Sequence, residues 1–428
     1  MPLSPTRMIR ASPYWPVIAH STLRRLLPGF TVSSLGDGMA VVAVSWLAIE
    51  LAPAAERGTW VALAAAAYTL SGSVGALVLG RFLRSRSPAQ LVGCDALLRA
   101  TALGAIPVCH AFGVLGVELY VALLAVSSVL HSWGQAGIYT ILSRLLPERD
   151  HLAGNAVFSG IGSLATVFGP PLAGALIVWG DAATVIAVDA ATFLVLAVTF
   201  LIGVPRDTAP APENGGSRTA GFAVIRRTPA LLGLLGLSFA FFFLFGPVYV
   251  ALPLHVSDDL GGSAALLAAF YTAFGVGAVL GSVVTGYLSR LPMWPVTTGI
   301  VIAFGFFLLP AGLGAPTWAA VAGFAVAGLL WPPYASLSTA LFQRSAPREL
   351  LPQVLAASSA VRVLSVPLGT ALGGPLVAAL GAQGTLSASA VSITVLGLAA
   401  ACAAHGASRK PVHPAAGSQA GPERVRGQ

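Results

Sequence analysis

Gly75-Ala-Leu-Val-Leu-Gly-Arg-Phe-Leu-Arg84 closes one long apolar segment, and Gly281-Ser-Val-Val-Thr-Gly-Tyr-Leu-Ser-Arg290 closes another. The glycines and the final arginines of these two stretches coincide at a shift of 206 residues. A second pair matches with a small gap, because residues 147–150 lead into Gly169-Pro170 and residues 347–349 lead into Val366-Pro367. The sequence therefore predicts two related halves, a weak internal symmetry that membrane proteins with repeated helical bundles show.

The composition places the chain in a lipid bilayer. Apolar residues make up 56% of it and charged residues only 9%, and its mean hydropathy is +0.84. Soluble domains carry about 25% charged residues, so this chain has too little charge to coat a soluble surface. Its 48 glycines and 30 prolines stand among apolar residues, which membrane helices tolerate.

Apolar segments of the length that a spanning helix needs, roughly 20 residues, recur along the chain. The first six are Leu26–Leu51, Thr59–Phe82, Leu91–Ala111, Leu119–Leu142, Asn155–Val178 and Thr184–Val204, and the last six are Leu231–Leu254, Ala264–Leu288, Trp294–Leu313, Trp318–Leu341, Val354–Leu380 and Leu386–Ala404. We predict an all-α membrane protein of twelve transmembrane helices in two six-helix halves, residues 26–204 and 231–404. Polar residues 205–230 link the halves, and segments 1–25 and 405–428 flank them, the second of these predicted to be disordered.

The distribution of basic residues predicts the topology. With the N-terminus placed inside, twenty of the 23 lysines and arginines fall in the inner segments and only Arg57 falls outside. Arg99 and Arg362 lie within helices. Cytoplasmic loops of membrane proteins carry this excess of basic residues, so we expect a multi-pass inner-membrane protein with both termini in the cytoplasm. No short apolar stretch with a cleavage site precedes the first segment, which predicts no cleaved signal peptide.

Several classes of function lack the residues that they need. Cys94, Cys109 and Cys402 fall inside apolar segments, which predicts neither a disulfide framework nor a metal site. The sole lysine, Lys410, precedes Pro411, so the chain has no ATP-binding P-loop. Basic residues scattered singly and in pairs argue against nucleic acid as a partner. A membrane enzyme would need polar catalytic clusters in sizeable loops, and we expect neither an enzyme nor a cofactor.

Five phrases stand in order between about Leu26 and Ala404: Ser34-Leu-Gly-Asp37-Gly, Asp95-Ala-Leu-Leu-Arg99-Ala, Leu145-Leu-Pro-Glu-Arg-Asp-His-Leu-Ala-Gly-Asn155-Ala, Gly169-Pro-Pro-Leu-Ala-Gly174 and Asp189-Ala-Ala-Thr-Phe. Together they resemble the major facilitator superfamily, and within it the branch that includes macrolide and enterobactin exporters. The resemblance implies a transporter of small molecules that works by alternating access, with its substrate site between the two halves. We expect it to act as a monomer.

The fifth predicted helix carries a segment that is similar to the antiporter motif of that superfamily. Gly169, Pro170 and Gly174 match Gly-Pro-x-x-Gly-Gly, with Ala173 in place of one glycine, and Gly160 lies nine residues upstream. In the family this motif marks exporters that exchange substrate for protons. The alternative is ordinary packing of small residues, which lets membrane helices approach closely.

The loop after the second predicted helix departs from the family pattern. Arg81 and Arg84 are retained, but Gly80 stands where the family has an acid. That acid would help to latch the cytoplasmic side, so its loss puts the gating role of this loop in doubt. Asp95 and Arg99, one helical turn apart near the same side, are interpreted as a local ion pair.

Charged groups within the predicted helices are candidates for coupling transport to protons, because a charge at the bilayer centre is costly without a partner or a function. Asp37, His131 and Arg362 lie near mid-depth. Asp37 is interpreted either as the proton carrier or as a structural partner of Arg362. His131 is interpreted either as a proton-exchange group or as a hydrogen-bonded residue of the bundle.

Polar and aromatic residues at the same depth are candidates for the wall of a substrate cavity: Gln135, Phe239, Phe243, Trp331 and Tyr334. Trp331 and Tyr334 flank two prolines that are expected to break or bend their helix. Aromatic packing is the alternative for each of these residues. Together, the features predict a proton-coupled exporter of a small amphipathic molecule, with an importer or facilitator of the same fold as the alternative.

Overall fold

The computed structural model describes residues 14–79, 83, 86–203, 218–288, 291–347 and 350–408, which form helices and no strand. The helices of the predicted spans in the N-terminal half are α3 (Ser21–Leu51), α4 (Arg57–Val78), α6 (Pro88–Ala111), α7 (Val117–Ser128), α8 (His131–Leu145), α9 (His151–Trp179) and α10 (Ala182–Gly203). Those of the C-terminal half are α12 (Pro229–Phe245), α13 (Val248–Leu254), α14 (Ala264–Leu288), α15 (Met293–Gly312), α16 (Thr317–Ser345) and α17 (Leu351–Ser408). Two short helices, α2 (Trp15–Ala19) and α11 (Arg218–Arg227), lie outside the predicted spans. The predicted all-α class is confirmed.

Ten helical stretches of the described residues are long and apolar enough to cross a membrane. The longest of these, Gln353–His405, is broken at Gly381, whose φ of 73° only glycine adopts readily. α4, with 22 residues, is a further apolar helix of spanning length. The architecture is therefore compatible with the predicted twelve membrane crossings.

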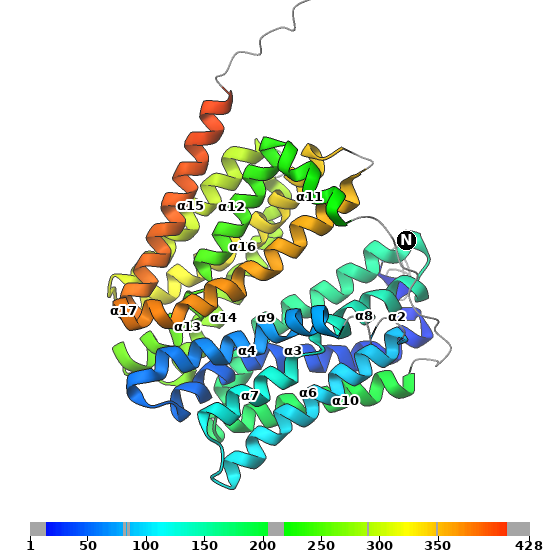
Figure 1. Ribbon diagram of the computed structural model, residues 1–428, viewed down its shortest axis with the longest axis vertical. Helices are drawn as coiled ribbons and strands as arrows, with labels where there is room; N and C mark the ends of the chain where they lie inside the picture. The colour runs from blue at the N-terminus through cyan, green and yellow to red at the C-terminus, as the bar shows by residue number, and fades with distance from the viewer. Residues whose placement is uncertain are drawn as a thin grey trace, which may run out of the picture.

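The helices form two bundles that touch at one end of the molecule. Figure 1 shows α3 to α10 in one bundle and α12 to α17 in the other, diverging toward the side on which α2 and α11 lie. Between the bundles, α9 packs against α14, and α4 packs against α17. These are equivalent pairs in the two halves, as the internal repeat predicts. We call the side with α2 and α11 the open end and the side where the bundles meet the closed end.

Glycines allow α3 and α9 to cross in backbone contact. A Cβ at Gly38 would overlap the carbonyl of Ala165, and one at Gly169 would overlap the backbone of Gly38. Small residues at such a crossing let two membrane helices approach closely. The crossing holds in place the middle of α3, where Asp37 lies.

Gly38→Val should therefore destabilise the protein by about 1–3 kcal/mol or more, because the added methyl groups force the two helices apart. Gly160→Val is the matched control on α9, since a Cβ at Gly160 meets no atom within 4 Å. Thermal unfolding of the purified proteins in detergent measures both effects. Equal melting temperatures for the two variants would contradict the role of this crossing.

The two prolines of α16 do not break the helix. α16 runs without interruption from Thr317 to Ser345 through Pro332 and Pro333. Of the two expected outcomes, the break is wrong and the bend stays a prediction, because each proline removes one backbone donor while the remaining hydrogen bonds continue on either side.

Part of the predicted gating loop, namely Gly80, Arg81 and Arg84, lies outside the described residues. The same holds for residues 1–13, 204–217 and 409–428 of the predicted flanking and linking segments.

Candidate substrate cavity

A cavity of about 460 Å³ lies in the interface between the bundles. Most of its wall comes from α3, α6, α8, α9 and α10 of the N-terminal half. The C-terminal half contributes Tyr249 of α13 together with Tyr271 and Phe274 of α14. The volume is within the range of pockets that bind small molecules, and the wall combines aromatic rings with a few polar groups.

Asp37 of α3 lies in the wall of the cavity and is tied to two residues behind it. Arg99 Nη1 of α6 donates to Asp37 Oδ1 at 2.8 Å, and Tyr68 Oη of α4 donates to the same oxygen at 2.9 Å. The side chain of Asp37 remains 38% exposed. Both bonds use one oxygen, so the other carboxylate oxygen is open to the cavity.

Arg99 is buried, and its positive charge balances the negative charge of the Asp37 carboxylate. Its side chain is only 2% exposed, and its guanidinium carbon lies 4.6 Å from the ring centroid of Phe193 and 5.2 Å from that of Tyr68. Stacking of this kind stabilises a cation that water cannot reach. The guanidinium thereby links α3, α4, α6 and α10.

Two predicted partnerships are wrong. Arg99 pairs with Asp37 across the bundle and not with Asp95, because its guanidinium extends toward α3. Arg362 does not pair with Asp37, because it lies on α17, whose neighbour in the other half is α4. Arg362 is half-buried and donates to Ser359 Oγ at 3.5 Å. Arg362 is not among the residues that line the cavity.

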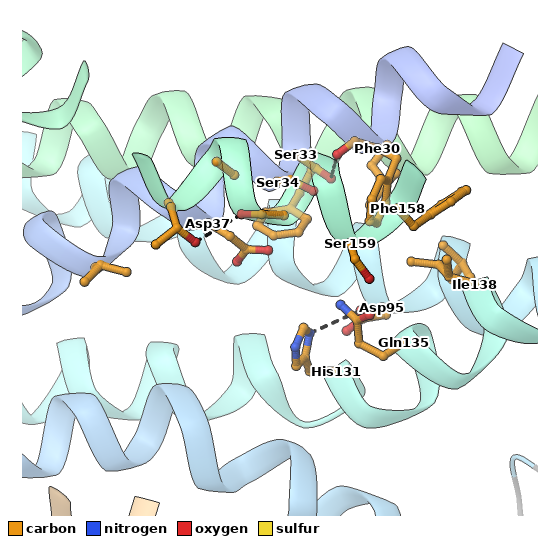
Figure 2. A pocket seen from close by; sticks show the side chains of 18 of the residues that line it. Phe30, Ser33, Ser34, Asp37, Asp95, His131, Gln135, Ile138, Phe158 and Ser159 are labelled. Carbon is orange, nitrogen blue, oxygen red and sulfur yellow. Dashed lines mark hydrogen bonds and ion pairs between the residues drawn. The ribbon is translucent and has the colours of Figure 1, made fainter. Parts of the chain in front are cut away.

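Asp95, His131 and Gln135 lie together on the wall formed by α6 and α8 (Figure 2). His131 Nδ1 is 3.9 Å from Asp95 Oδ2. The carboxylate of Asp95 fits against Gly134, where a Cβ would overlap it. The structure thus places two of the three predicted coupling residues, Asp37 and His131, at one cavity.

The predicted aromatic candidates occupy a different place. Trp331 and Tyr334 join a packed cluster with Phe241, Phe242 and Phe304, and Tyr334 is fully buried with its hydroxyl 3.1 Å from Ser238 Oγ. Phe239 and Phe243 stack on each other with centroids 5.6 Å apart. None of the four lines the cavity described above, whereas Gln135 does.

Of the antiporter-like residues of α9, some pack against neighbouring helices and one lines the cavity. Gly169 contacts Gly38, and Gly174 faces Ala268 of α14 across the interface between the halves. Pro170 lines the cavity, whereas Gly160 is exposed. This segment of α9 therefore contributes both to the wall of the cavity and to the contact between the two bundles.

Sequence reasoning missed Tyr68, Tyr249 and Tyr271. All three are tyrosines inside apolar helices, and a hydroxyl at such a position requires a partner or a polar cavity. That requirement is the signal that points to them in the sequence, but it does not tell which tyrosine belongs to which site.

An ion pair joins the halves at the closed end. Arg57 Nη1, at the start of α4, lies 2.9 Å from Asp258 Oδ1. Asp258 belongs to a π-helical turn, His255–Asp259, that follows α13. The two side chains are 34% and 41% exposed, so water screens the pair. The pair must separate if the closed end opens.

Arg57→Ala should favour opening of the closed end by about 0.2–1 kcal/mol, the range of exposed ion pairs. The readout is the labelling rate of a cysteine introduced at Ala62, which lies beside Gly374 of α17. We expect labelling to rise up to about fivefold. The swapped pair Arg57→Asp with Asp258→Arg should restore the slow rate, and unchanged labelling in Arg57→Ala would show that the pair does not hold this end.

Two pseudo-symmetric bundles of apolar helices with a cavity at their interface form the architecture of a secondary transporter. The family profile of the Major Facilitator Superfamily matches residues 26–370, and the chain belongs to this superfamily. As a member of this superfamily, the chain is a transporter.

Two of the proteins that this chain resembles in sequence are efflux pumps. The multidrug efflux pump Tap of Mycolicibacterium fortuitum is 26% identical over 394 residues, which cover 85% of this chain and 91% of Tap. Macrolide efflux protein A of Enterococcus faecalis is 23% identical over 291 residues, covering 65% of this chain and 88% of that protein.

A solved structure supports the fold. A bacterial homologue of the iron transporter ferroportin, in an inward-facing state, superposes with a TM-score of 0.66 at 15% identity, covering 89% of this chain and 97% of the other. A similarity at this identity shows the fold alone.

Proposed function

We propose that this protein is a proton-coupled exporter of a small amphipathic molecule in the inner membrane. The observation that carries the proposal is the placement of Asp37, a carboxylate with one oxygen paired and the other open, in an aromatic-lined cavity between the halves. A carboxylate in this position can exchange a proton with the same space that holds the substrate. The similarity to two efflux pumps favours export as the direction.

The orientation of the protein in the membrane is inferred from the distribution of its basic residues. Cytoplasmic loops are the basic ones, so both termini are assigned to the cytoplasm and the open end faces it. A substrate then enters the cavity from the cytoplasm while the Arg57–Asp258 end is closed. Because one chain provides the whole wall of the cavity, we infer that a monomer is sufficient.

The membrane potential supplies enough free energy for this function. One proton crossing 100 mV yields about 2.3 kcal/mol. At about 1.4 kcal/mol per tenfold ratio, this supports a gradient of roughly fiftyfold. A gradient of this size lowers the cellular concentration of a toxic compound enough to confer resistance.

The test is accumulation of ethidium and of a panel of hydrophobic antibiotics in a pump-deficient bacterial host. Expression should lower accumulation of at least one compound, and a protonophore should restore it to the level of the vector control. Accumulation that rises on expression would favour the importer. Lowered accumulation that a protonophore does not change would contradict proton coupling.

A further inference from the structure

Two short helices at the open end, α2 and α11, occupy equivalent places in the two halves (Figure 1). A single residue separates each from the long helix that follows, His20 before α3 and Thr228 before α12. α2 packs against α3 and α9, and α11 packs against α12 and α17. The internal repeat makes α9 equivalent to the first part of α17, so the two short helices have the same neighbours in their own halves.

One face of each short helix is buried in its own half. Val17 of α2 is fully buried, and Ile225 of α11 is 1% exposed. Other apolar side chains of the same helices are not covered by protein, since Ile18 is 47% exposed and Phe222 is 43% exposed. Packing therefore holds each helix in place and leaves a large apolar side chain at the surface.

A pair of adjacent arginines accompanies each short helix. Arg24 and Arg25 follow α2, and Arg226 and Arg227 end α11. All four are exposed, and none of their side chains forms an ion pair or a hydrogen bond within the part of the chain that the structure describes. Residues 1–36 and 214–257 contain no aspartate or glutamate. Two pairs of positive charges without an acidic partner attract an anionic surface.

Both pairs lie at the depth of the lipid headgroups. Arg25 directly precedes Leu26, where the first predicted span begins, and Arg227 lies four residues before Leu231, where the seventh begins. Four helical residues cover about 6 Å, and the headgroup region is about 5–8 Å thick on each side of the hydrocarbon core. A guanidinium at this depth can donate two parallel hydrogen bonds to a phosphodiester, and an apolar side chain beside it can rest among the acyl chains.

We propose that the open end binds anionic phospholipids at two equivalent surfaces, in the leaflet that this end faces. Ile18, Arg24 and Arg25 form the N-terminal pad, and Phe222, Arg226 and Arg227 form the C-terminal pad. The arginines of each pad hold the phosphodiester, and its apolar side chain contacts the acyl chains. None of the six residues lines the cavity, so the pads do not bind the transported molecule. Because α2 packs against α9 and α11 packs against α17, each bound lipid attaches one helix of the interface between the halves to the membrane surface.

Competition between two lipids tests the pads. The purified full-length protein in detergent is titrated with dioleoylphosphatidylglycerol and dioleoylphosphatidylcholine, which share their acyl chains and differ in net charge, and native mass spectrometry counts the bound molecules. We expect the wild type to bind two molecules of phosphatidylglycerol roughly ten- to thirtyfold more tightly than phosphatidylcholine, since two arginines near an anionic surface contribute about fivefold each. An excess of inorganic phosphate should displace neither molecule.

Two double variants separate the pads. They are Arg24→Gln with Arg25→Gln, and Arg226→Gln with Arg227→Gln. Each should abolish one of the two tight binding events, and the four substitutions together should bring the ratio of the two dissociation constants close to one. Arg144→Gln with Arg149→Gln is the matched control, because it removes two arginines from the last turn of α8 and the turn before α9, outside both pads. We expect it to leave both tight binding events in place.

The outcomes are distinct from those of the export assay, because lipid binding in detergent involves neither a gradient nor a transported molecule. Equal binding of the two lipids by the wild type overturns the proposal, and so does an unchanged preference in the folded fourfold variant. Displacement by inorganic phosphate would identify a site for a free anion and overturn it as well. A loss of preference in the control as large as in the pad variants would show that overall charge, and not the pads, selects the lipid. Loss of one binding event in each pad variant, with the control unchanged, supports the proposal.

Discussion

Arg99→Leu should lower the free energy of unfolding by about 3–5 kcal/mol, the cost of removing one partner of a buried ion pair. The leucine leaves the Asp37 carboxylate without its cation, so that Tyr68 is the one remaining hydrogen-bond donor to that oxygen among the described residues. It also removes the guanidinium that stacks against Phe193. Because Arg99 joins four helices of the N-terminal half, its loss loosens the bundle as a whole. Unfolding of the purified protein in mixed detergent micelles measures the change.

Arg362→Leu is the matched control, since it removes the same group from a half-buried position in the other half. We expect a change within about 0.5–1 kcal/mol, because its hydrogen bond to Ser359 is long. Adding Asp37→Asn to Arg99→Leu should recover part of the lost stability, because no uncompensated charge then remains. Additive losses in the double variant would contradict the ion pair as the source of the effect.

The helices could be predicted from the sequence because each span is a local property. About 20 apolar residues between polar turns are enough to define a membrane helix, whatever surrounds it. The predicted segment Leu26–Leu51 lies within α3, and Ala264–Leu288 coincides with α14. Two predicted segments, Val354–Leu380 and Leu386–Ala404, fall on either side of the Gly381 break in α17.

The partners of buried groups could not be predicted in the same way, because they depend on how helices rotate and cross. Spacing of four residues suggested that Arg99 pairs with Asp95, but the guanidinium extends to Asp37, which is 62 positions away in the chain. Depth suggested that Trp331 and Tyr334 line a cavity, yet both face into an aromatic cluster within their own bundle. The depth of a residue along a membrane helix can be predicted from sequence. The direction of its side chain around the helix axis cannot be predicted when the helix is apolar on all sides.

Asp37→Asn should abolish transport driven by a pH gradient while the protein stays folded and continues to bind its substrate. An asparagine oxygen can accept the same two hydrogen bonds from Arg99 and Tyr68, so the local geometry should persist. What the variant loses is the ability to take up and release a proton at the cavity surface. Protonation of Asp37 weakens its attraction to Arg99, so each proton that binds alters the link between α3 and α6. An amide cannot make this change.

Proteoliposomes loaded with a substrate found in the cellular assay measure the effect. An imposed pH gradient should drive transport by the wild type, whereas Asp37→Asn should fall to the level of empty liposomes. Exchange of labelled for unlabelled substrate without a gradient should continue in both, because exchange needs no net proton movement. Asp37→Asn leaves the buried Arg99 guanidinium without its counter-ion, so we expect it to lower the free energy of unfolding as well. Transport is therefore compared only in Asp37→Asn protein that the unfolding measurements show to be folded. Full proton-driven transport by a well-folded Asp37→Asn variant would show that Asp37 does not carry the proton. Asp95 and His131, which also line the cavity, would then be the remaining candidates.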